Sequence, residues 1–462
     1  MPLPRGITAG GGVAFAALAG FAIALAVLYP GQYPFDSAYQ LWQARHGAFF
    51  NITLVSMIGV WSLLLRAFDS PGSLLCLNLA LFWTGLGMCA DTLRAPAWLK
   101  VSGLVLAGLN PLALVQMAHL LSDAHMTAVM FLGMGLMARA MNGGSRLTLV
   151  AACLLFVYAG TIRQNALVAV IPLGPLALIA VRPGKPFGMK LGIVSTMVAG
   201  LLALVAGTAL DRLLATERRE VWPMLALWDL AAISVATDQL QLPPFTHGAG
   251  LDVNELRETG AFNPVSVTYL YSNSRSGMND GFLEPYSAEQ RYAIARAWWT
   301  AIRDHPLAYL AHRAETARLL FGKQSGTPHG IPYYQARTAY RDNPALPTPW
   351  FDSVQQGLYA VAEQLRSTWL FSALPYLLID AAAFALAWTR RRRRQAAIAL
   401  GMSSSALLYA ASFLVLAPSA ELRYLTWPII AALPALGLAL GARQIRSSGS
   451  EPQLPVRPSA VS

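Results

Sequence analysis

Charged side chains are scarce in this chain. Only 12% of its 462 residues are charged and 55% are hydrophobic, whereas an average soluble domain is about 25% charged. Acidic residues are also unevenly placed, because the first 210 residues hold four of them and 16 of the 23 lie between Asp211 and Glu363. These absences exclude a disordered protein, a fibre and an ordinary soluble enzyme. They are typical of a membrane protein with one polar insert.

Cysteine is rare as well. Cys76, Cys89 and Cys153 lie in apolar runs without metal-ligand spacing, so we expect neither a structural disulfide nor a zinc site. The short motifs of soluble nucleotide and hydrolase chemistry are missing from the sequence too. The net charge of +11 would suit nucleic acid, but five basic residues form the single run 390–394 at the end of an apolar segment. We therefore expect no nucleic-acid partner and contact of this run with membrane lipids.

Long apolar runs are what the sequence does contain. A spanning helix needs about 20 mostly apolar residues, and the sequence predicts an all-α polytopic membrane protein with about ten transmembrane helices. The apolar core of the first run is longer than that of a signal peptide, so we expect a retained anchor. The predicted spans are 9–29, 72–93, 97–117, 125–141, 147–162, 166–181, 191–210, 369–389, 395–417 and 424–442.

The positive-inside rule predicts the orientation. The arginine run 390–394 and the basic loop 182–190 are expected in the cytoplasm, and ten spans then leave both termini there as well. Residues 49–67 are apolar too, but an eleventh span would put Arg5 outside. We therefore interpret 49–67 as a helix in the outer interface.

This topology divides the chain into four parts. An N-terminal transmembrane module of seven spans covers 1–210, a mainly helical extracytoplasmic insert covers 211–368, a C-terminal module of three spans covers 369–442, and a cytoplasmic tail covers 443–462. An insert of this length is a domain or a lid.

Within the insert, the apolar stretch 222–236 predicts a helix packed on the membrane surface. Ser287 and Gln290 have capping-box spacing, and Pro306 predicts a break between two helices. The aromatic residues Trp298 and Trp299 favour packing over sugar binding.

Two outward carboxylates are candidate site residues. Asp36 follows the first span, and Asp123 precedes the fourth. A carboxylate at a membrane surface is expensive to desolvate, which suggests that it has a functional role. Each position also suits a helix N-cap, and spacing alone favours that interpretation. With His119 and His125 nearby, a divalent cation is the one cofactor the sequence allows, although no ligand spacing supports a metal site.

Two outward arginines complete the candidates. Arg163 with Asn165, and Arg423 with Tyr424, lie at the outer ends of spans, against the positive-inside tendency. A guanidinium fork suits phosphate. The alternatives are arginines that snorkel to the lipid headgroups and, for Arg423, simple pairing with Glu421.

These residues together resemble the GT-C glycosyltransferases, integral membrane enzymes that use polyprenyl-phosphate sugars and include the protein O-mannosyltransferases and the aminoarabinose transferases of lipid A. The resemblance rests on Pro30-Gly31 with Asp36-Ser37, on the second outward aspartate, on the Arg-x-Asn turn at 163–165 and on Arg423-Tyr424. The helix pair with Ala297 to Ile302 and His305 to Arg313 looks like uncharacterised bacterial members.

The resemblance implies a bacterial inner-membrane enzyme that moves a sugar from a polyprenyl-phosphate donor to an envelope glycan, lipid or protein at the periplasmic face, with inversion. It implies Asp36 as general base, and Asp123, Arg163, Asn165, Arg423 and Tyr424 as substrate-binding residues, with an arginine on the leaving phosphate. The chain departs from many relatives at Ser37, where they carry a second acid, and at 46–51, where they carry a His-Pro pair. These departures leave an inactive member open.

Two other classes compete with this interpretation. A transporter or flippase of a lipid-linked envelope precursor is the main alternative. Such proteins often show inverted repeats, broken helices and midplane charges, whereas this chain has one large asymmetric outer insert and its candidate charges near the outer surface, which favours an interfacial enzyme. A structural or assembly protein is the third.

Overall fold

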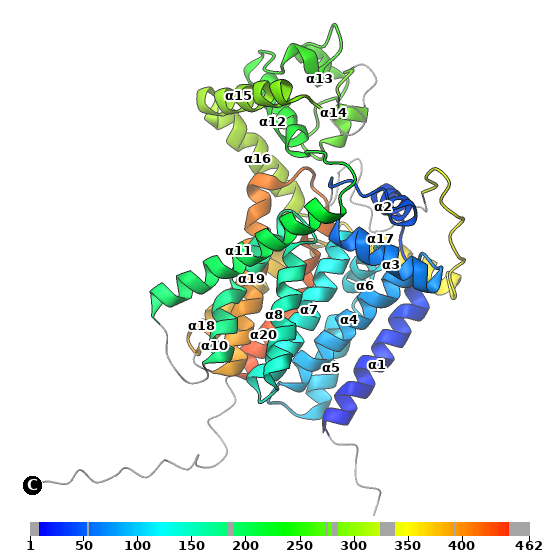
Figure 1. Ribbon diagram of the computed structural model, residues 1–462, viewed down its shortest axis with the longest axis vertical. Coiled ribbons are helices and arrows are strands. Elements are labelled where there is room, and N and C mark those ends of the chain that lie inside the picture. Colours follow the sequence, from blue (N-terminus) through cyan, green and yellow to red (C-terminus); the bar gives the residue numbers. More distant parts are fainter. Residues whose placement is uncertain are drawn as a thin grey trace, which may run out of the picture.

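The structure is a computed structural model that describes residues 9–442 except 53–54, 183–187, 273–275, 280–284, 324–337 and 392. The described residues form helices and loops without a β-strand, which confirms the predicted all-α class. Figure 1 shows a bundle of helices with a smaller helical unit stacked on one end. The predicted tail 443–462 and the N-terminal Arg5 lie outside the described residues.

Six of the described helices are long and apolar enough to cross a membrane, and they indicate a multi-pass membrane protein. The last of them, α20, is extended at its start by the 3-10 turn η3 (Leu422–Leu425), and the turn and the helix together form the apolar segment. The six are α1 (Ala9–Leu28), α4 (Ser73–Asp91), α7 (Ser122–Met141), α11 (Met189–Leu214), α19 (Arg394–Leu416) and α20 (Thr426–Gly441).

Shorter apolar helices occupy the other predicted spans, so the number ten stays a prediction. They are α8 (Arg146–Gly160), α9 (Ala166–Val170), α10 (Leu173–Val181) and α18 (Leu374–Trp388). Residues 56–68 of the expected interfacial segment form α3 (Ser56–Phe68).

The predicted span 97–117 is a bent pair of helices, which together are long and apolar enough to form one broken span. The chain forms α5 (Ala97–Gly108) and α6 (Pro111–Ala118), bent by 53° at the break between them. The cause is local: the Asn110 side chain accepts a hydrogen bond from the backbone NH of Ala113 at 2.8 Å, and Pro111 takes the first helical position. A capped helix start with proline at this position favours a new helix over continuation of the old one.

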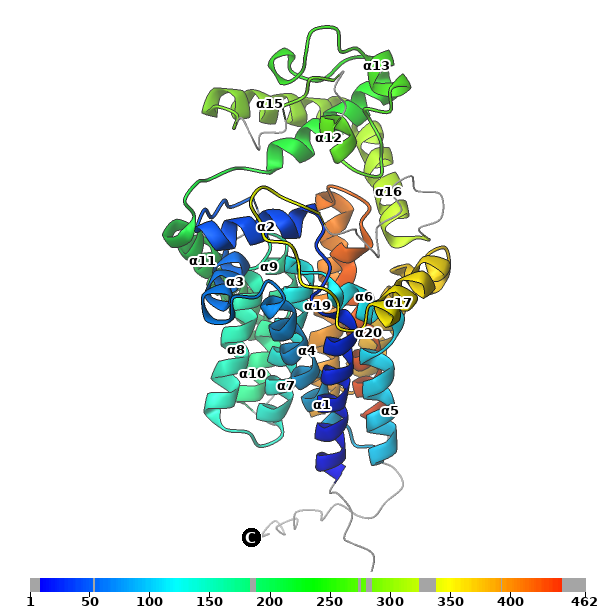
Figure 2. The same cartoon turned by 90° about the vertical axis from the view of Figure 1, so that its right-hand side faces the viewer.

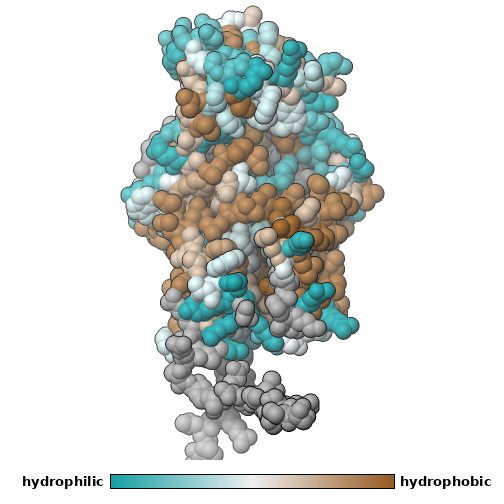
Figure 3. All heavy atoms as spheres, turned by 90° about the vertical axis from the view of Figure 1, so that its left-hand side faces the viewer, coloured by the Kyte–Doolittle hydropathy of each residue, from teal (hydrophilic) through white to brown (hydrophobic). Residues whose placement is uncertain are grey.

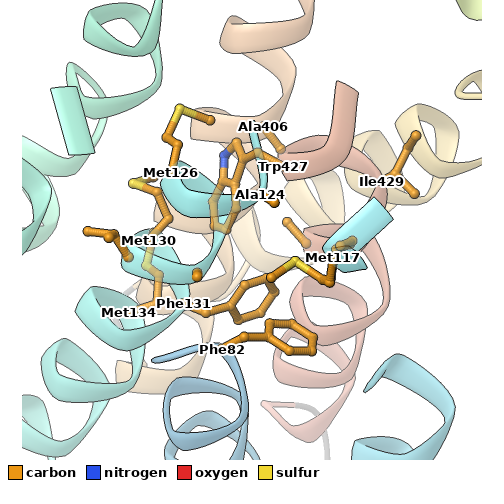
Figure 4. Packing of buried hydrophobic residues seen from close by; sticks show 14 of the residues in the cluster. Phe82, Met117, Ala124, Met126, Met130, Phe131, Met134, Ala406, Trp427 and Ile429 are labelled. Carbon is orange, nitrogen blue, oxygen red and sulfur yellow. The ribbon is translucent and has the colours of Figure 1, made fainter. Parts of the chain in front are cut away.

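The bundle is centred on α7, most of which is buried, whereas few residues of α1 and α11 are buried. Figure 4 shows Met126, Met130 and Met134, one helical turn apart on α7, beside an aromatic group. In that group Phe131 meets Trp427 of α20 edge-on, with ring centroids 5.4 Å apart. The indole NH of Trp427 donates to Ser405 at 3.1 Å, so the buried ring has a partner for its polar atom.

The surface has the polarity that a membrane protein requires. Figure 3 shows a hydrophobic band around the bundle, with hydrophilic residues on the stacked unit above it and at the opposite end below it. A helix of 20 residues such as α1 spans about 30 Å, the thickness of the hydrocarbon core.

The stacked unit belongs to the insert and has its own hydrophobic core. Its helices are α12 (Trp222–Thr237), α13 (Val253–Glu258), α14 (Thr268–Ser272), α15 (Ala288–Asp304) and α16 (Pro306–Phe321), with the 3-10 turn η1 (Pro244–Thr246). The predicted capping box of Ser287 and Gln290 and the break before Pro306 are both confirmed.

The prediction that 222–236 packs on the membrane surface is wrong. Helix α12 is buried along most of its length and packs against α13, α15 and α16. A helix that is apolar on all sides is typical of a core, and here the core is that of the insert.

Two further helices pack on the helices of the bundle. Helix α2 (Phe35–His46) crosses the end of the bundle below the insert, as Figure 2 shows. Helix α17 (Asp352–Leu365), followed by the turn η2 (Trp369–Phe371), packs on α6 and α1, and its Tyr359 belongs to the core of the bundle.

Candidate functional site

Loops at the bundle end that faces the insert are tied to one another by backbone hydrogen bonds. The NH of Gln32 donates to the carbonyl of Ala118 at 2.8 Å, and the NH of Leu120 donates to the carbonyl of Gln32 at 3.3 Å. The hydroxyl of Ser37 donates to the carbonyl of Leu120 at 3.0 Å. The loop before Asp36 is therefore fixed beside the loop before Asp123.

Asp36 does not cap its helix. The N-cap of α2 is Pro34, and Asp36 lies inside the first turn, so the capping interpretation is wrong. Its Oδ2 accepts a hydrogen bond from Nη2 of Arg423 at 2.8 Å. The Asp36 side chain is 48% exposed while that of Arg423 is 14% exposed, so the carboxylate faces solvent from the rim of a more deeply buried arginine.

Asp123 is not a cap either, because the N-cap of α7 is Leu121. Its Oδ1 lies 2.5 Å from Nη1 of Arg163, which also donates to the hydroxyl of Ser122 at 3.1 Å. The Asp123 side chain is 3% exposed and that of Arg163 is 16% exposed. A carboxylate this deeply buried needs a charged partner, and Arg163 supplies it.

Tyr424 joins the two ion pairs. The guanidinium carbons of Arg163 and Arg423 each lie 5.3 Å from the centroid of its ring, so they are no further apart than twice that distance. Its hydroxyl lies 3.0 Å from the hydroxyl of Ser419. The structure thus brings Asp36, Asp123, Arg163 and Arg423 together around one aromatic ring.

Asn165 belongs to the same group. Its side-chain oxygen accepts from Nε of Arg163 at 3.4 Å, and it interacts with Tyr409 of α19. Tyr409 is a member that sequence reasoning missed, because a tyrosine inside an apolar run carries no signal of its own.

Glu421 adds a third carboxylate. It pairs with Nε of Arg423 and accepts a hydrogen bond from Ser419 at 3.0 Å. The expected pairing with Glu421 is therefore confirmed, and it coexists with the pairing to Asp36. Since Arg163 and Arg423 are mostly buried in ion pairs, the interpretation of snorkelling arginines is wrong.

A divalent cation does not fit this arrangement. Asp36 and Asp123 each face a guanidinium, and among the described residues no group of three histidine, cysteine, aspartate or glutamate side chains is placed to hold a metal ion. His125 lies within the bundle, where its ring nitrogens contact Asn78 at 2.7 Å and Tyr158 at 2.8 Å. The site therefore offers an anion two arginines, each of which is neutralised by carboxylates in this state.

No protein-family model matches the chain, and a search of the curated proteins finds no match either. The geometry of the site is therefore the main basis for a functional assignment.

Proposed function

We propose that the chain is a membrane glycosyltransferase that moves a sugar from a polyprenyl-phosphate donor to an envelope glycan, lipid or protein. The observation that supports this most strongly is the convergence of Asp36, Arg423 and Arg163 around Tyr424 at the insert end of an apolar bundle. A half-exposed carboxylate beside two buried guanidiniums offers one group for a hydroxyl and two for a phosphate.

Arg423 is shared between these two tasks. It holds Asp36 in the absence of substrate, and a donor phosphate gains it only by displacing a carboxylate. Asp36 is the most exposed of the three carboxylates, with 48% of its side chain exposed against 23% for Glu421 and 3% for Asp123. Donor binding therefore frees Asp36 at the moment when a base is needed.

The chemical step follows from these positions. Asp36 takes the proton of the acceptor hydroxyl as the oxygen forms a bond to C1 of the sugar. The bond from C1 to the phosphate oxygen breaks on the opposite face, which inverts the configuration at C1. The bonding electron pair leaves on the phosphate, which gains a second negative charge, and Arg423 and Arg163 stabilise that charge where it develops.

The wider arrangement is consistent with this proposal. The polyprenyl tail runs along the apolar helices, the insert lies over the site, and the site faces the periplasm of a bacterial inner membrane with both termini in the cytoplasm. Ten spans and the extracytoplasmic position of the insert are part of the proposal. Reporter fusions after residues 145 and 280 test them, with cytoplasmic and periplasmic signals expected respectively; the reverse would overturn the topology.

The proposal is tested with purified protein in proteoliposomes and radiolabelled polyprenyl-phosphate sugars. Asp36→Asn is expected to reduce transfer about 100- to 10,000-fold, the usual contribution of a general base. Asp69→Asn is the matched control, because Asp69 ends α3 in a left-handed conformation that asparagine accepts. Normal transfer by a folded Asp36→Asn protein would rule Asp36 out as the base.

A transporter or flippase remains the second candidate because of one observation, the bent helix pair α5 and α6. Broken helices often line transport sites. The second candidate replaces the first if neither the wild type nor Asp36→Asn transfers sugar, and if Asp36→Asn abolishes a movement of the lipid-linked donor between leaflets that the wild type supports.

A further inference from the structure

Arg313 of α16 joins the core of the insert to the loop that carries Arg423. Its Nη2 lies 2.6 Å from Oδ1 of Asp229 on α12, and its Nη1 donates to the carbonyl oxygen of Ala417 at 2.9 Å. The Arg313 side chain is 4% exposed and that of Asp229 is fully buried. One guanidinium fork therefore connects the insert with the end of α19.

The Asp229–Arg313 pair is firmly held. The indole NH of Trp298 donates to Asp229 at 3.0 Å, and Nε2 of His312 lies 3.4 Å from it. The Arg313 guanidinium lies over the ring of Trp228, 5.6 Å from its centroid. Removal of either partner would leave an unpaired buried charge, so each residue of the pair holds the other in place.

Backbone hydrogen bonds attach the insert to the same loop. The NH of Val267 donates to the carbonyl of Pro418 at 3.0 Å, and the NH of Ala420 donates to the carbonyl of Val265 at 2.7 Å. In Figures 1 and 2 helix α16 descends from the insert to this end of the bundle. The loop is thus held by the insert immediately before Glu421 and Arg423.

We infer that the insert sets the position of the site through the loop 417–423, with Arg313 and Asp229 as positioning residues for Arg423. The path is short: Arg313 holds Ala417. The carbonyl of Val265 in the insert holds Ala420, and Glu421 pairs with Arg423. The meaning of this link for catalysis rests on the proposed function. Because coupling is reciprocal, a ligand that withdraws Arg423 from Asp36 also changes the contacts of the insert.

Three variants separate positioning from folding. Arg313→Met combined with Asp229→Asn removes the donor to Ala417 without leaving an unpaired buried charge. Arg313→Lys keeps the charge, but a single ammonium lacks the fork that reaches both partners. Arg318→Met is the control, because Arg318 is on the same helix and pairs with Glu315 at the surface.

Amide hydrogen exchange of the full chain is the first readout and needs no substrate. Exchange at Ala420 is expected to become at least tenfold faster in the double variant and in Arg313→Lys, with unchanged exchange in the middle of α7 and in the Arg318→Met control. Unchanged exchange at Ala420 in Arg313→Lys would overturn the inference. This test remains valid if the double variant fails to fold.

Transfer kinetics are the second readout. Displacement of Arg423 predicts a KM for the polyprenyl-phosphate donor about tenfold higher, whereas a smaller folded fraction lowers only kcat. A lowered kcat with an unchanged KM would contradict positioning. Faster exchange at Ala420 in the Arg313 variants, together with no sugar transfer by the wild-type protein, would support the link and overturn the proposed function. The failure of the inference and the failure of the proposed function are therefore distinguishable.

Discussion

Asp36 and Arg423 lie 387 positions apart in the chain and form an ion pair of 2.8 Å. The pair joins the first turn of α2 to the turn η3 before α20, at the end of the bundle that faces the insert. In the proposed function the two residues separate once substrates bind, because the exposed carboxylate of Asp36 takes the acceptor hydroxyl and the buried guanidinium of Arg423 takes the donor phosphate.

Substitution of Arg423 tests the phosphate partner. Arg423→Met is expected to lower kcat/KM for the donor about 100-fold, because a charge-assisted bidentate contact to the leaving phosphate is lost. Arg423→Lys keeps the charge without the fork and should lose about tenfold. Initial rates in proteoliposomes measure both, with Arg66→Met as the control; equal rates for all three variants would contradict the assignment.

The buried pair of Asp123 and Arg163 predicts an asymmetric effect on stability. Asp123→Ala leaves a buried guanidinium without its partner and should lower the free energy of unfolding by about 3–5 kcal/mol. Combining Asp123→Leu with Arg163→Met removes both charges and should recover most of that loss. Thermal unfolding in detergent measures the difference, and a double variant less stable than Asp123→Ala would be inconsistent with this account.

Close packing of α4 on α7 predicts a third result. A Cβ at Gly85 would lie 2.2 Å from the backbone carbonyl of Phe131, whereas a Cβ at Gly103 meets nothing within 4 Å. Gly85→Ala should therefore force the helices apart and lower Tm by several degrees. Gly103→Ala on α5 is the matched control and should leave Tm unchanged or slightly higher, since alanine favours helix.

His312 predicts a pH effect on the insert. Burial, with Arg313 beside it, lowers the pKa of His312 to about 3, so its contribution to stability is complete above pH 6.5 and is lost as the pH falls from 6.5 towards 3. Burial raises the pKa of Asp229 to about 6 against the pull of Arg313, so protonation of that carboxyl between pH 6 and 3.8 stabilises the fold. Tyr309 also faces Asp229.

The two effects oppose each other in the wild-type protein. Removal of the imidazole in His312→Gln leaves the Asp229 contribution alone, so the insert of the variant should gain about 1 kcal/mol of stability between pH 7 and pH 5. The wild-type insert should lose stability slightly over the same range. Hydrogen exchange of α12 measures both, and parallel pH profiles would contradict this assignment.

Sequence reasoning reached the site through charges that the predicted orientation left unexplained. These charges are Asp36, Asp123, Arg163 and Arg423, and the structure brings them together. The sequence does not predict the ion pair of Asp36 with Arg423, because a contact across 387 positions depends on how the helices pack. Spacing alone does not distinguish the N-cap from the first turn of a helix, so it favours capping for Asp36, whereas the structure places Asp36 in the first turn.

The fold shows the same limit. Hydropathy locates the apolar helices, but it does not separate a helix buried in a small core from one on a membrane surface. For that reason the sequence predicts α12 on the membrane surface, whereas the structure places it in the core of the insert. Asn110 and Pro111 carried the signal for the bend between α5 and α6, which the length of the apolar run concealed.

The most direct test measures binding of polyprenyl monophosphate to purified protein. Because Asp36 competes with phosphate for Arg423, Asp36→Asn should bind this lipid about tenfold more tightly than wild type while transferring sugar at least about 100-fold more slowly. Arg423→Met should bind the lipid about 100-fold more weakly. Weaker binding by Asp36→Asn, or equal binding by all three proteins, would contradict the claim that Arg423 passes from the base to the donor phosphate.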